Sequence, residues 1–466
     1  MNVIHGDCLE ELKKLDDNSV DAVITDPPYG LSNTKPAQVA DVLKAWVTGD
    51  TVSVPAKRGG FMGKDWDSFV PPPAVWEECM RVLKPGGHMA VFAGARTQDL
   101  MGLSIRLAGF EIRDTLGWIY GSGMPKSHNI SKAIDKAAGA EREEFADPRW
   151  EDRYPNGNGG NHNRGPNGIY GQAESVLGRK LTTSNPVTES AKQWDGWGTA
   201  LKPAIEPIIL ARKPLDGTVA NNVLAHGVGG LNIDACRVDN GDFQAKKGRG
   251  IGTLRLDGCS TLDELRHLAE RGEKCPNGRD AATTLRRIEA ADARMADWTP
   301  PPPGRFPANV LLDEHAAKEM DEQSGVSVSR VRKHRDSHEA KESTAAYGDY
   351  GVAAYDRGTS DEGGASRFFP VFKYQAKAPK KERPVIERED GSKIQHPTVK
   401  PLTLLEWLVT LITPPGGVVL DPFAGSGTTL QAAINKGFQP IGIEQDADYI
   451  KLIEKRLEAT CTTHKN

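Results

Sequence analysis

We predict an α/β fold with one core and a mostly parallel sheet. The two halves of this core lie at opposite ends of the chain, and a large central insertion separates them in the sequence. Short apolar runs typical of strands buried on both faces alternate with helical patterns at both ends. Loops rich in proline or glycine directly follow these runs. The middle of the chain is polar and irregular, with the Asn/Gly-rich stretch 154–171, expected to be a mobile loop, and a proline spacer at 300–303.

The apolar periodicity predicts individual elements. In the first part of the chain it predicts strands at 2–4, 19–25 and 88–93, with helices at 8–15 and 74–83 and a Lys-Pro-Gly-Gly break at 84–87. In the last part it predicts strands at 418–420 and 440–443 and helices at 401–412 and 428–435. A further helix should follow the strand at 440–443 and end at about residue 457. Between these parts we expect a strand at 205–211 and short helices near 261–271 and 280–296.

Composition excludes several classes of protein. The 466 residues carry 59 Lys and Arg against 63 Asp and Glu, a net charge of −4, which excludes a globally basic nucleic-acid binder of the histone type. Contact with a polyanion would therefore need a local basic patch. No apolar stretch approaches the ~18 residues of a membrane span, and the first residues do not resemble a signal peptide. The six cysteines form no CxxC pair, so we predict no disulfide framework, no metal site and a reducing cytoplasm.

The segment Asp26-Pro27-Pro28-Tyr29 follows one of the apolar runs. It should therefore lie at the carboxyl edge of a parallel sheet, where α/β proteins bind their ligands. Asp26 offers an acceptor, and the prolines fix φ and lack N–H groups, which leaves their carbonyls as acceptors at a rigid corner. Tyr29 offers a flat face. Such a group can hold an exocyclic amino group and stack on the ring that bears it. The alternative is a strand-ending turn with a packed tyrosine.

A second pattern of strand, glycine loop and helix covers Asp421-Pro422-Phe423-Ala424-Gly425-Ser426-Gly427-Thr428-Thr429. Glycines let the backbone approach a ligand closely, and the helix N-terminus adds N–H donors. Glu444 ends the next strand about 20 residues later, where an acidic side chain binds ribose hydroxyls in nucleotide-type α/β sites. The alternative is a plain tight turn. No Gly-Lys-Ser/Thr follows the glycines, so an ATP-binding P-loop is not predicted.

These motifs resemble those of the S-adenosylmethionine-dependent DNA amino-methyltransferases, which methylate adenine N6 or cytosine N4. The resemblance rests on DPPY at 26–29, FAGSGTT at 423–429 and HPTVKP at 396–401. Their order, with the catalytic motif before the insertion and the cofactor motif after it, is similar to the permuted β class. The resemblance covers 1–126 and 371–466 well, 195–213 weakly and the rest hardly at all. It implies a Rossmann-like methyltransferase core with a circularly permuted motif order.

The resemblance also implies residue roles. Asp26, Pro27, Pro28 and Tyr29 would be catalytic. The residues that would bind the cofactor S-adenosylmethionine are Asp7, Cys8, Thr398, Lys400, Asp421, Phe423, Ala424, Gly425, Ser426, Gly427, Thr428 and Glu444. In detail, the glycine loop would wrap the methionine part, Thr398 and Lys400 would hold its carboxylate, Glu444 the ribose and Asp7 the adenine edge. The alternatives are a helix N-cap for Asp7 and a solvated lysine for Lys400.

The implied reaction is methylation of the N6 amino group of a flipped adenine in double-stranded DNA. Asp at position 26 favours adenine, and cytosine N4 is the alternative, because both bases carry an amino group beside a ring nitrogen. Cytosine C5 chemistry is disfavoured because no Pro-Cys occurs. More remote alternatives are methylation of RNA or of a protein glutamine, and a catalytically silent DNA-binding regulator.

The DNA contacts are expected in loops and in the insertion. Trp66 would line the target-base pocket and Lys126 would approach the DNA backbone. Basic side chains that suit phosphates and guanine edges are Arg330, Arg332, Lys333, Arg335, Lys380 and Lys381. The alternatives are a packed loop around Trp66 and a solvated basic face elsewhere.

We therefore divide the chain into five segments. These are the catalytic half of the core (1–126), a flexible loop insertion (127–194), a returning core strand (195–214), a target-recognition region (215–370) and the cofactor-binding half (371–466). The expected partner is duplex DNA in a bacterial cytoplasm or nucleoid, or from a phage, and not a membrane. A homodimer and a cognate restriction endonuclease on another chain are candidate partners that the sequence leaves open.

Overall fold

The structure is a computed structural model, and its contacts divide the chain into two units. The first comprises residues 1–230, 313–315 and 372–466, and the second comprises residues 231–312 and 316–371. The residues described are 2–32, 34–55, 67–121, 123, 127–146, 182–238, 259, 261–296, 304–329, 361–372, 384–388 and 390–463. The predicted mobile loop at 154–171 and the proline spacer at 300–303 lie outside these ranges.

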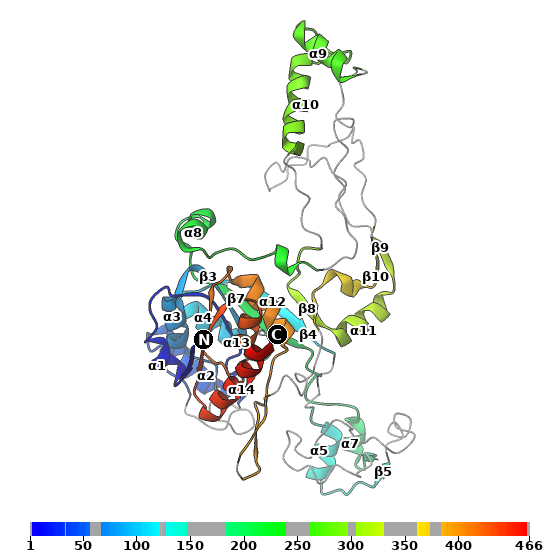
Figure 1. Ribbon diagram of the computed structural model, residues 1–466. Helices are drawn as coiled ribbons and strands as arrows, with labels where there is room; N and C mark the ends of the chain where they lie inside the picture. The colour runs from blue at the N-terminus through cyan, green and yellow to red at the C-terminus, as the bar shows by residue number, and fades with distance from the viewer. Residues whose placement is uncertain are drawn as a thin grey trace. The chain divides into compact units, whose positions relative to one another are not determined.

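A twisted sheet forms the centre of the first unit (Figure 1). Within this sheet, strands of the first unit follow the order β1-β15-β14-β2-β3-β7-β4, so β15 and β14 from the last part of the chain lie between β1 and β2 from the first part. β1, β15, β14, β2 and β3 pair in parallel, and β7 is antiparallel to both of its neighbours. The bounds are β1 (Asn2–His5), β2 (Val20–Thr25), β3 (Leu83–Phe92), β4 (Glu111–Ile119), β7 (Ile205–Arg212), β14 (Val418–Asp421) and β15 (Gln439–Glu444). The predicted mostly parallel α/β core is confirmed.

Helices cover both faces of this sheet. From β1 through β2 and β3 to β4 the chain advances across the sheet in one direction, whereas from β14 to β15 it moves the opposite way. Right-handed crossovers therefore place α1, α3 and α4 on one face and α13 on the other. The helices are α1 (Cys8–Leu12), α2 (Pro36–Val47), α3 (Pro73–Val82), α4 (Gln98–Leu107), α8 (Val219–His226), α12 (Leu402–Ile412), α13 (Thr428–Asn435) and α14 (Ala447–Thr463).

The core explains why the strands are so apolar. Every residue of β2 is buried, as expected for a central strand with helices on both faces. Trp76 of α3 and Met89 of β3 are fully buried on the α1/α3/α4 face. The buried Asp21 carboxylate at the start of β2 accepts bonds from Lys84 Nζ at 2.6 Å and from the Val418 N–H at 2.7 Å. The two ends of the chain are thus joined at the amino edge of the sheet.

Smaller elements of the first unit lie outside the sheet. The helices α5 (Ile130–Ala137) and α7 (Glu189–Gln193) pack together around the buried Asp135, which accepts bonds from the Thr188 N–H and hydroxyl and from Arg142. Burial opposes the ionised form of Asp135, but these hydrogen bonds outweigh it and hold the pKa well below its usual range. The remaining strands are β5 (Glu144–Ala146), β6 (Thr182–Ser184), β12 (Ile386–Glu387) and β13 (Lys393–Ile394).

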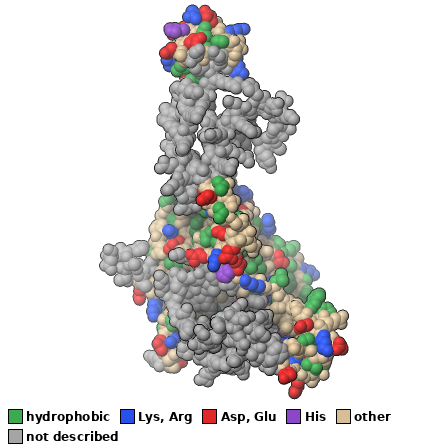
Figure 2. Space-filling view, turned by 90° about the vertical axis from the view of Figure 1, so that its right-hand side faces the viewer, with side chains coloured by type: hydrophobic (Ala, Val, Ile, Leu, Met, Phe, Trp, Pro, Cys, Tyr) green, Lys and Arg blue, Asp and Glu red, His purple; other side chains and the backbone are tan. Residues whose placement is uncertain are grey.

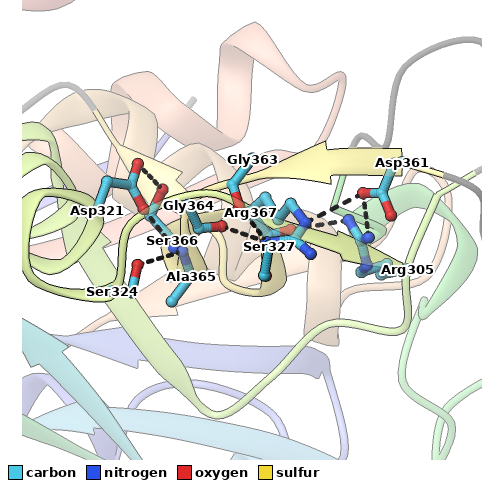
Figure 3. A network of polar contacts seen from close by, with 10 residues as sticks. All are labelled: Arg305, Asp321, Ser324, Ser327, Asp361, Gly363, Gly364, Ala365, Ser366 and Arg367. Carbon is cyan, nitrogen blue, oxygen red and sulfur yellow. Dashed lines mark hydrogen bonds and ion pairs between the residues drawn. The ribbon is translucent and has the colours of Figure 1, made fainter. Parts of the chain in front are cut away.

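A polar network organises one part of the second unit (Figure 3). Asp361 forms ion pairs with Arg305 and Arg367, and both guanidinium groups lie over the ring of Phe368. Asp321 accepts bonds from the Ser366 N–H and hydroxyl at 2.8 and 2.7 Å. The elements that carry the residues drawn in Figure 3 include α11 (Glu314–Ser324), β9 (Ser327–Ser329), β10 (Asp361–Gly363) and η6 (Ala365–Phe368). The short strands β8 (Val310–Asp313) and β11 (Val371–Phe372) are their neighbours along the chain.

A helix pair forms another part of the second unit. The helices α9 (Leu262–Glu270) and α10 (Ala281–Ala296) pack around the buried Cys259, Leu265 and Cys275. Acidic and basic side chains are interspersed on this part, at the top of the space-filling view (Figure 2). Neighbouring charges pair there, as in Arg266–Asp263. The short helix η4 (Asp234–Cys236) also belongs to the second unit.

The predicted elements are found with shifted ends. The strands at 19–25, 205–211 and 440–443 and the helix at 428–435 match within a residue or two. The helix predicted at 8–15 ends at Leu12. The helix predicted at 74–83 ends at Val82, just before the predicted break at 84–87, but the strand predicted at 88–93 starts earlier, because β3 begins at Leu83 and accommodates 84–87 by a register shift against β2. Gly86 has a φ of +76°, which permits the irregularity.

We expect Arg81→Met to destabilise the first unit by about 2 kcal/mol, because buried carbonyls would lose a charged donor. Arg81 donates to Leu12 O and to Leu15 O, each at 2.8 Å, and also pairs with Glu78. The measurement is urea-induced unfolding. Lys13→Met is the control, since the exposed Lys13 pairs with the equally exposed Glu10 at the surface. Equal effects of the two substitutions would contradict the role given to Arg81.

Candidate active site

Loops that follow five strands meet at one edge of the sheet. Because β1, β15, β14, β2 and β3 are parallel, their carboxyl ends lie on the same side. The antiparallel β7 brings its amino end to that side, where the Ala93 N–H after β3 donates to Pro207 O at 2.9 Å. Residues from positions 7, 26, 206, 421 and 444 therefore share one edge, as expected for a ligand site in an open α/β sheet.

The Asp26–Tyr29 corner is held rigidly. Pro27 is buried and Pro28 is half-buried, and their rings fix φ directly after β2. Gly30 follows with a φ of +67°, and a Cβ there would lie 2.8 Å from the backbone of Phe69. The Gly30 N–H donates to the buried Asp67 carboxylate at 3.0 Å, and the Thr97 hydroxyl donates to Tyr29 O at 2.6 Å. The turn is thus fixed from two sides.

Four polar side chains converge beyond this corner. Lys400 Nζ lies 2.7 Å from Asp26 Oδ2, 3.0 Å from the Tyr29 hydroxyl and 3.5 Å from Glu206 Oε1. The Tyr29 hydroxyl also lies 2.8 Å from Asp26 Oδ1 and 2.9 Å from Glu206 Oε1. The Lys400 ammonium stands over the Phe92 ring, 4.9 Å from its centroid. Asp26, Tyr29, Glu206 and Lys400 are called the carboxylate–lysine cluster below.

Burial sets the electrostatics of the carboxylate–lysine cluster. Desolvation alone would lower the pKa of Lys400, but the charges of Asp26 and Glu206 outweigh it, so that the pKa is raised and the ammonium form persists. Burial and both neighbouring carboxylates raise the pKa of Tyr29 well above 10, which keeps it a phenol. The side chain of Asp26 remains 23% exposed. A carboxylate next to a retained cation can therefore face a ligand while each of its oxygens keeps a lone pair for it.

The glycine loop lies beside this corner. Gly425 and Gly427 have φ values of +53° and +77°, which favour glycine. Arg456 of α14 donates from Nε to Ser426 O at 2.7 Å and from Nη2 to the Ser426 hydroxyl at 3.3 Å. The His396 ring stands close to Gly425, where an added Cβ would lie 3.0 Å from His396 Nε2. The loop is therefore held from behind, with its backbone close to neighbouring groups.

Acidic groups flank the glycine loop. Asp421 is buried and accepts bonds from the Thr25 hydroxyl at 2.7 Å and the Phe423 N–H at 3.1 Å. Burial raises the pKa of Asp421 to about 6 although these bonds favour its ionised form. Glu444 accepts bonds from the Gly425 and Asp446 N–H groups, each at 2.8 Å, and burial raises its pKa to about 7.

The end of β1 completes the edge. Asp7 caps the N-terminus of α1 by accepting from the Leu9 and Glu10 N–H groups at 2.9 and 3.3 Å. The capping geometry offered as the alternative for Asp7 is therefore present, which leaves its role toward a ligand a prediction. Burial raises the pKa of Cys8 to about 12, so Cys8 is a neutral thiol at neutral pH and no nucleophile.

The described residues bring most of the predicted site together. The catalytic corner and the glycine loop, 396 positions apart along the chain, touch through Thr25 and Asp421. Phe423 packs against Trp76 with ring centroids 6.3 Å apart, Ala424, Ser426 and Thr428 are buried, and Thr398 is exposed. Lys400 lies in the carboxylate–lysine cluster, so the predicted alternative of a solvated lysine is wrong. The predicted DNA contacts lie outside the described residues: Trp66, Lys126, Arg330, Arg332, Lys333, Arg335, Lys380 and Lys381.

Two residues of the site were not anticipated. Glu206 follows a proline-containing segment at the amino end of β7. In a parallel sheet, ligand-binding residues are expected at the carboxyl ends of the strands and not at their amino ends. Arg456 lies within the apolar pattern of α14, and only its 5% exposure marks it as unusual for an arginine. In the described part of the chain, no three His, Cys, Asp or Glu side chains are grouped as a metal site would require, and no helix has the length and apolar character needed to cross a membrane.

Comparisons with known proteins agree with this picture. The family model described as DNA methylase, of the N6/N4 methyltransferases, matches residues 20–455. A type II methyltransferase of Streptococcus pneumoniae, M2.DpnII, is 46% identical over 70 residues, 15% of this chain and 26% of that protein. The DNA adenine methyltransferase YhdJ of Escherichia coli K12 is 49% identical over 63 residues, 14% of this chain and 21% of that protein. The chain thus matches about a quarter of the length of these relatives.

Solved structures of DNA methyltransferases align with this chain at low sequence identity and low TM-score. The M1.HpyAVI–SAM complex aligns over 98% of both chains with 14% identity and a TM-score of 0.35. The cytosine-N4-specific PvuII DNA methyltransferase aligns over 97% of this chain and 85% of that chain, with 13% identity and a TM-score of 0.36.

We expect Thr25→Val to lower the free energy of unfolding by about 1–3 kcal/mol, because the buried Asp421 would lose a donor that joins the two halves of the core. Thr25 is fully buried. Thr48→Val is the matched control, because the Thr48 hydroxyl bonds its own exposed helix end. Denaturant unfolding of both variants gives the difference. A Thr25 variant as stable as the Thr48 variant would show that the Thr25–Asp421 bond does not hold the halves together.

Proposed function

The chain belongs to the N6/N4 DNA methylase family, and from this premise we propose that it transfers a methyl group from S-adenosylmethionine to the N6 amino group of a flipped adenine in double-stranded DNA. The observation that carries the proposal is the contact between the catalytic corner and the glycine loop. Asp26 follows the Thr25 whose hydroxyl donates to Asp421 at 2.7 Å. A group bound at the glycine loop would therefore adjoin a base held at Asp26.

The residues at the edge fit S-adenosylmethionine. Glycines 425 and 427 have positive φ values and carry no Cβ of their own, as a loop whose backbone approaches a ligand closely requires. Glu444 offers a carboxylate at the end of β15, a position suited to ribose hydroxyls. Asp7 would take the adenine edge, Phe423 and the loop the methionine part, and Thr398 its carboxylate. When bound, this cofactor supplies a methyl group on a sulfonium centre.

Lys400 is better placed for the target base than for the cofactor's carboxylate. Its ammonium has three N–H donors, and three acceptor atoms of the carboxylate–lysine cluster lie within 3.5 Å of it. Binding a cofactor carboxylate would require Lys400 to leave these partners. We therefore assign Lys400 to the catalytic corner, where it keeps a positive charge beside the Asp26 carboxylate.

We propose a role toward the base for each residue of the corner. Flipping the adenine costs a few kcal/mol of unstacking, and stacking on Tyr29 would recover roughly 1–3 kcal/mol. Asp26 and the Pro27 carbonyl accept the amino hydrogens and so orient the nitrogen lone pair. Each Asp26 oxygen already accepts one bond, from Tyr29 or Lys400, and retains a lone pair for the base. The rigid corner holds the base in place, and such positioning provides much of the acceleration.

Adenine is the proposed target. Aspartate at position 26 favours it, and a relative with a similar segment is named a DNA adenine methyltransferase. Cytosine N4 methylation is the second candidate, since the name of the family covers both N6 and N4 methyltransferases. We take duplex DNA in the cytoplasm as the substrate. A homodimer, a restriction endonuclease partner and the target-recognition role of 215–370 stay predictions.

The proposed function is tested by incubating the full chain with labelled S-adenosylmethionine and duplex DNA, and digesting the DNA to nucleosides. We expect label in N6-methyladenine. Label in N4-methylcytosine alone would replace the base assignment. Label in RNA or protein but not in duplex DNA would overturn the proposal, as would the absence of transfer to all three.

We expect Asp26→Ala to lower kcat at least ~100-fold, by analogy with the loss of one well-placed polar group in an active site. Cofactor affinity should persist, because Asp26 contacts Lys400 and Tyr29 rather than the glycine loop. Methyl transfer and equilibrium dialysis with cofactor measure the two effects. Asp41→Ala on the exposed side of α2 is the control. Wild-type turnover in Asp26→Ala would remove Asp26 from the mechanism.

We expect cofactor affinity to fall as the pH drops through about 7, where Glu444 takes up a proton. The ionised carboxylate accepts hydroxyl hydrogens more strongly than the neutral acid. Since the raised pKa of Glu444 belongs to the protein without cofactor, binding should also release a proton near this pH. Calorimetric titration at several pH values measures both quantities. Glu444→Gln should bind weakly with little pH dependence, and an unaltered pH dependence in that variant would refute the assignment.

A further inference from the structure

Glu206 connects the antiparallel strand of the sheet to the catalytic corner. It lies at the amino end of β7, with 19% of its side chain exposed. Its Oε1 is 2.9 Å from the Tyr29 hydroxyl and 3.5 Å from Lys400 Nζ. The Tyr29 hydroxyl is simultaneously 2.8 Å from Asp26 Oδ1. Two carboxyl groups thus approach one phenol oxygen.

The number of protons available around the Tyr29 hydroxyl restricts the protonation of the two carboxyl groups. The Tyr29 hydroxyl has one proton and two lone pairs. Lys400 donates to one lone pair at 3.0 Å, and the single proton can make a linear bond to only one carboxyl oxygen. The second short O···O contact therefore needs another proton, which a carboxylic acid supplies to the remaining lone pair of Tyr29. If both carboxyl groups were ionised, one of the contacts at 2.8 and 2.9 Å would join two acceptors without a hydrogen.

The position of Lys400 selects the carboxyl group that keeps the proton. Its ammonium is 2.7 Å from Asp26 but 3.5 Å from Glu206, so it compensates a negative charge on Glu206 the less well of the two. Burial raises the pKa of Glu206, Lys400 opposes this rise, and the charge of Asp26 adds to it. In the described part of the chain, Lys400, Asp26 and Tyr29 are the charged and titratable side chains that act on Glu206.

We propose that Glu206 is a positioning residue that stands as a neutral acid and donates its proton to the Tyr29 hydroxyl, which directs the proton of Tyr29 to Asp26. This inference rests on the function proposed above. With Glu206 neutral, the cluster contains one cation, Lys400, and one anion, Asp26. The Tyr29 oxygen is then fixed by three hydrogen bonds, which orients its ring and one oxygen of the catalytic carboxylate.

The decisive comparison is Glu206→Gln with Glu206→Ala, in the full chain with duplex DNA and S-adenosylmethionine. A glutamine amide can donate to Tyr29 as a neutral acid does, so Glu206→Gln should keep kcat within about 5-fold of wild type. Alanine leaves the phenol without that donor, and kcat should fall about 10- to 100-fold with little change in the KM for the cofactor. In a Tyr29→Phe background the difference between the two substitutions should largely disappear, because the hydroxyl that they serve is gone.

A second readout needs no substrate. If Glu206 loses its proton as the pH rises, the folded state gains a second buried anion beside Asp26. The unfolding temperature of wild type should then fall relative to that of Glu206→Gln as the pH rises above about 4.5, the ordinary pKa of a glutamate, because the unfolded chain gives up this proton before the folded one. This comparison separates the inference from the proposed function, since it holds for a chain that methylates nothing.

A loss in Glu206→Gln as large as that in Glu206→Ala would overturn the proposal, because the ionised carboxylate would then be the active form. Full activity of Glu206→Ala would overturn it as well. If the alanine variant does not fold, Glu206→Gln decides alone: a loss of about 100-fold contradicts a neutral Glu206, whereas near wild-type turnover supports it. A wild-type chain that transfers no methyl group to DNA would refute the proposed function, and the unfolding temperatures would then decide the state of Glu206.

Discussion

The structure of the site depends on one buried cation, Lys400, between two carboxyl groups from distant parts of the chain. Lys400 precedes α12 and its contact with Asp26 spans 374 positions. A buried ammonium is costly without partners, and so is a buried carboxyl pair. The ammonium and the carboxyl groups therefore stabilise each other. Their contacts hold three segments together: the segment before α12, the corner after β2 and the amino end of β7. The geometry of this cluster is thus a consequence of charge balance as much as of backbone shape.

The sheet supplies the second constraint. Parallel strands put the loops after β1, β2, β14 and β15 on one edge regardless of their order along the chain. For this reason a chain that begins with the catalytic corner and ends with the glycine loop can build the same compact site as one with the opposite order. The contact between Thr25 and Asp421 shows that the two halves meet directly. Arg456 behind the loop and Asp67 behind the corner provide the rigidity that positioning requires.

Much of this site could be predicted from sequence because its signals are local. A buried apolar run followed by Asp-Pro-Pro-Tyr, and a strand followed by Gly-Ser-Gly, each place their residues at the carboxyl edge without tertiary information. Glu206 carries no such signal, because its strand is antiparallel and its site is at the strand's beginning. The position of Lys400 also needed the structure, since only the fold shows which anions surround it. The residues expected to read DNA lie outside the described ranges, so their assignment still rests on sequence.

If Asp26 and Lys400 act as one unit in methyl transfer, their contributions to kcat are coupled, and a double-mutant cycle measures this coupling. Asp26→Asn and Lys400→Met would be measured singly and together in methyl transfer to duplex DNA. Because residues that act as a unit are not additive, we expect the double variant to be about as slow as the slower single variant. A double variant slowed by the product of the two single effects would contradict the coupling, since the two side chains would then contribute independently.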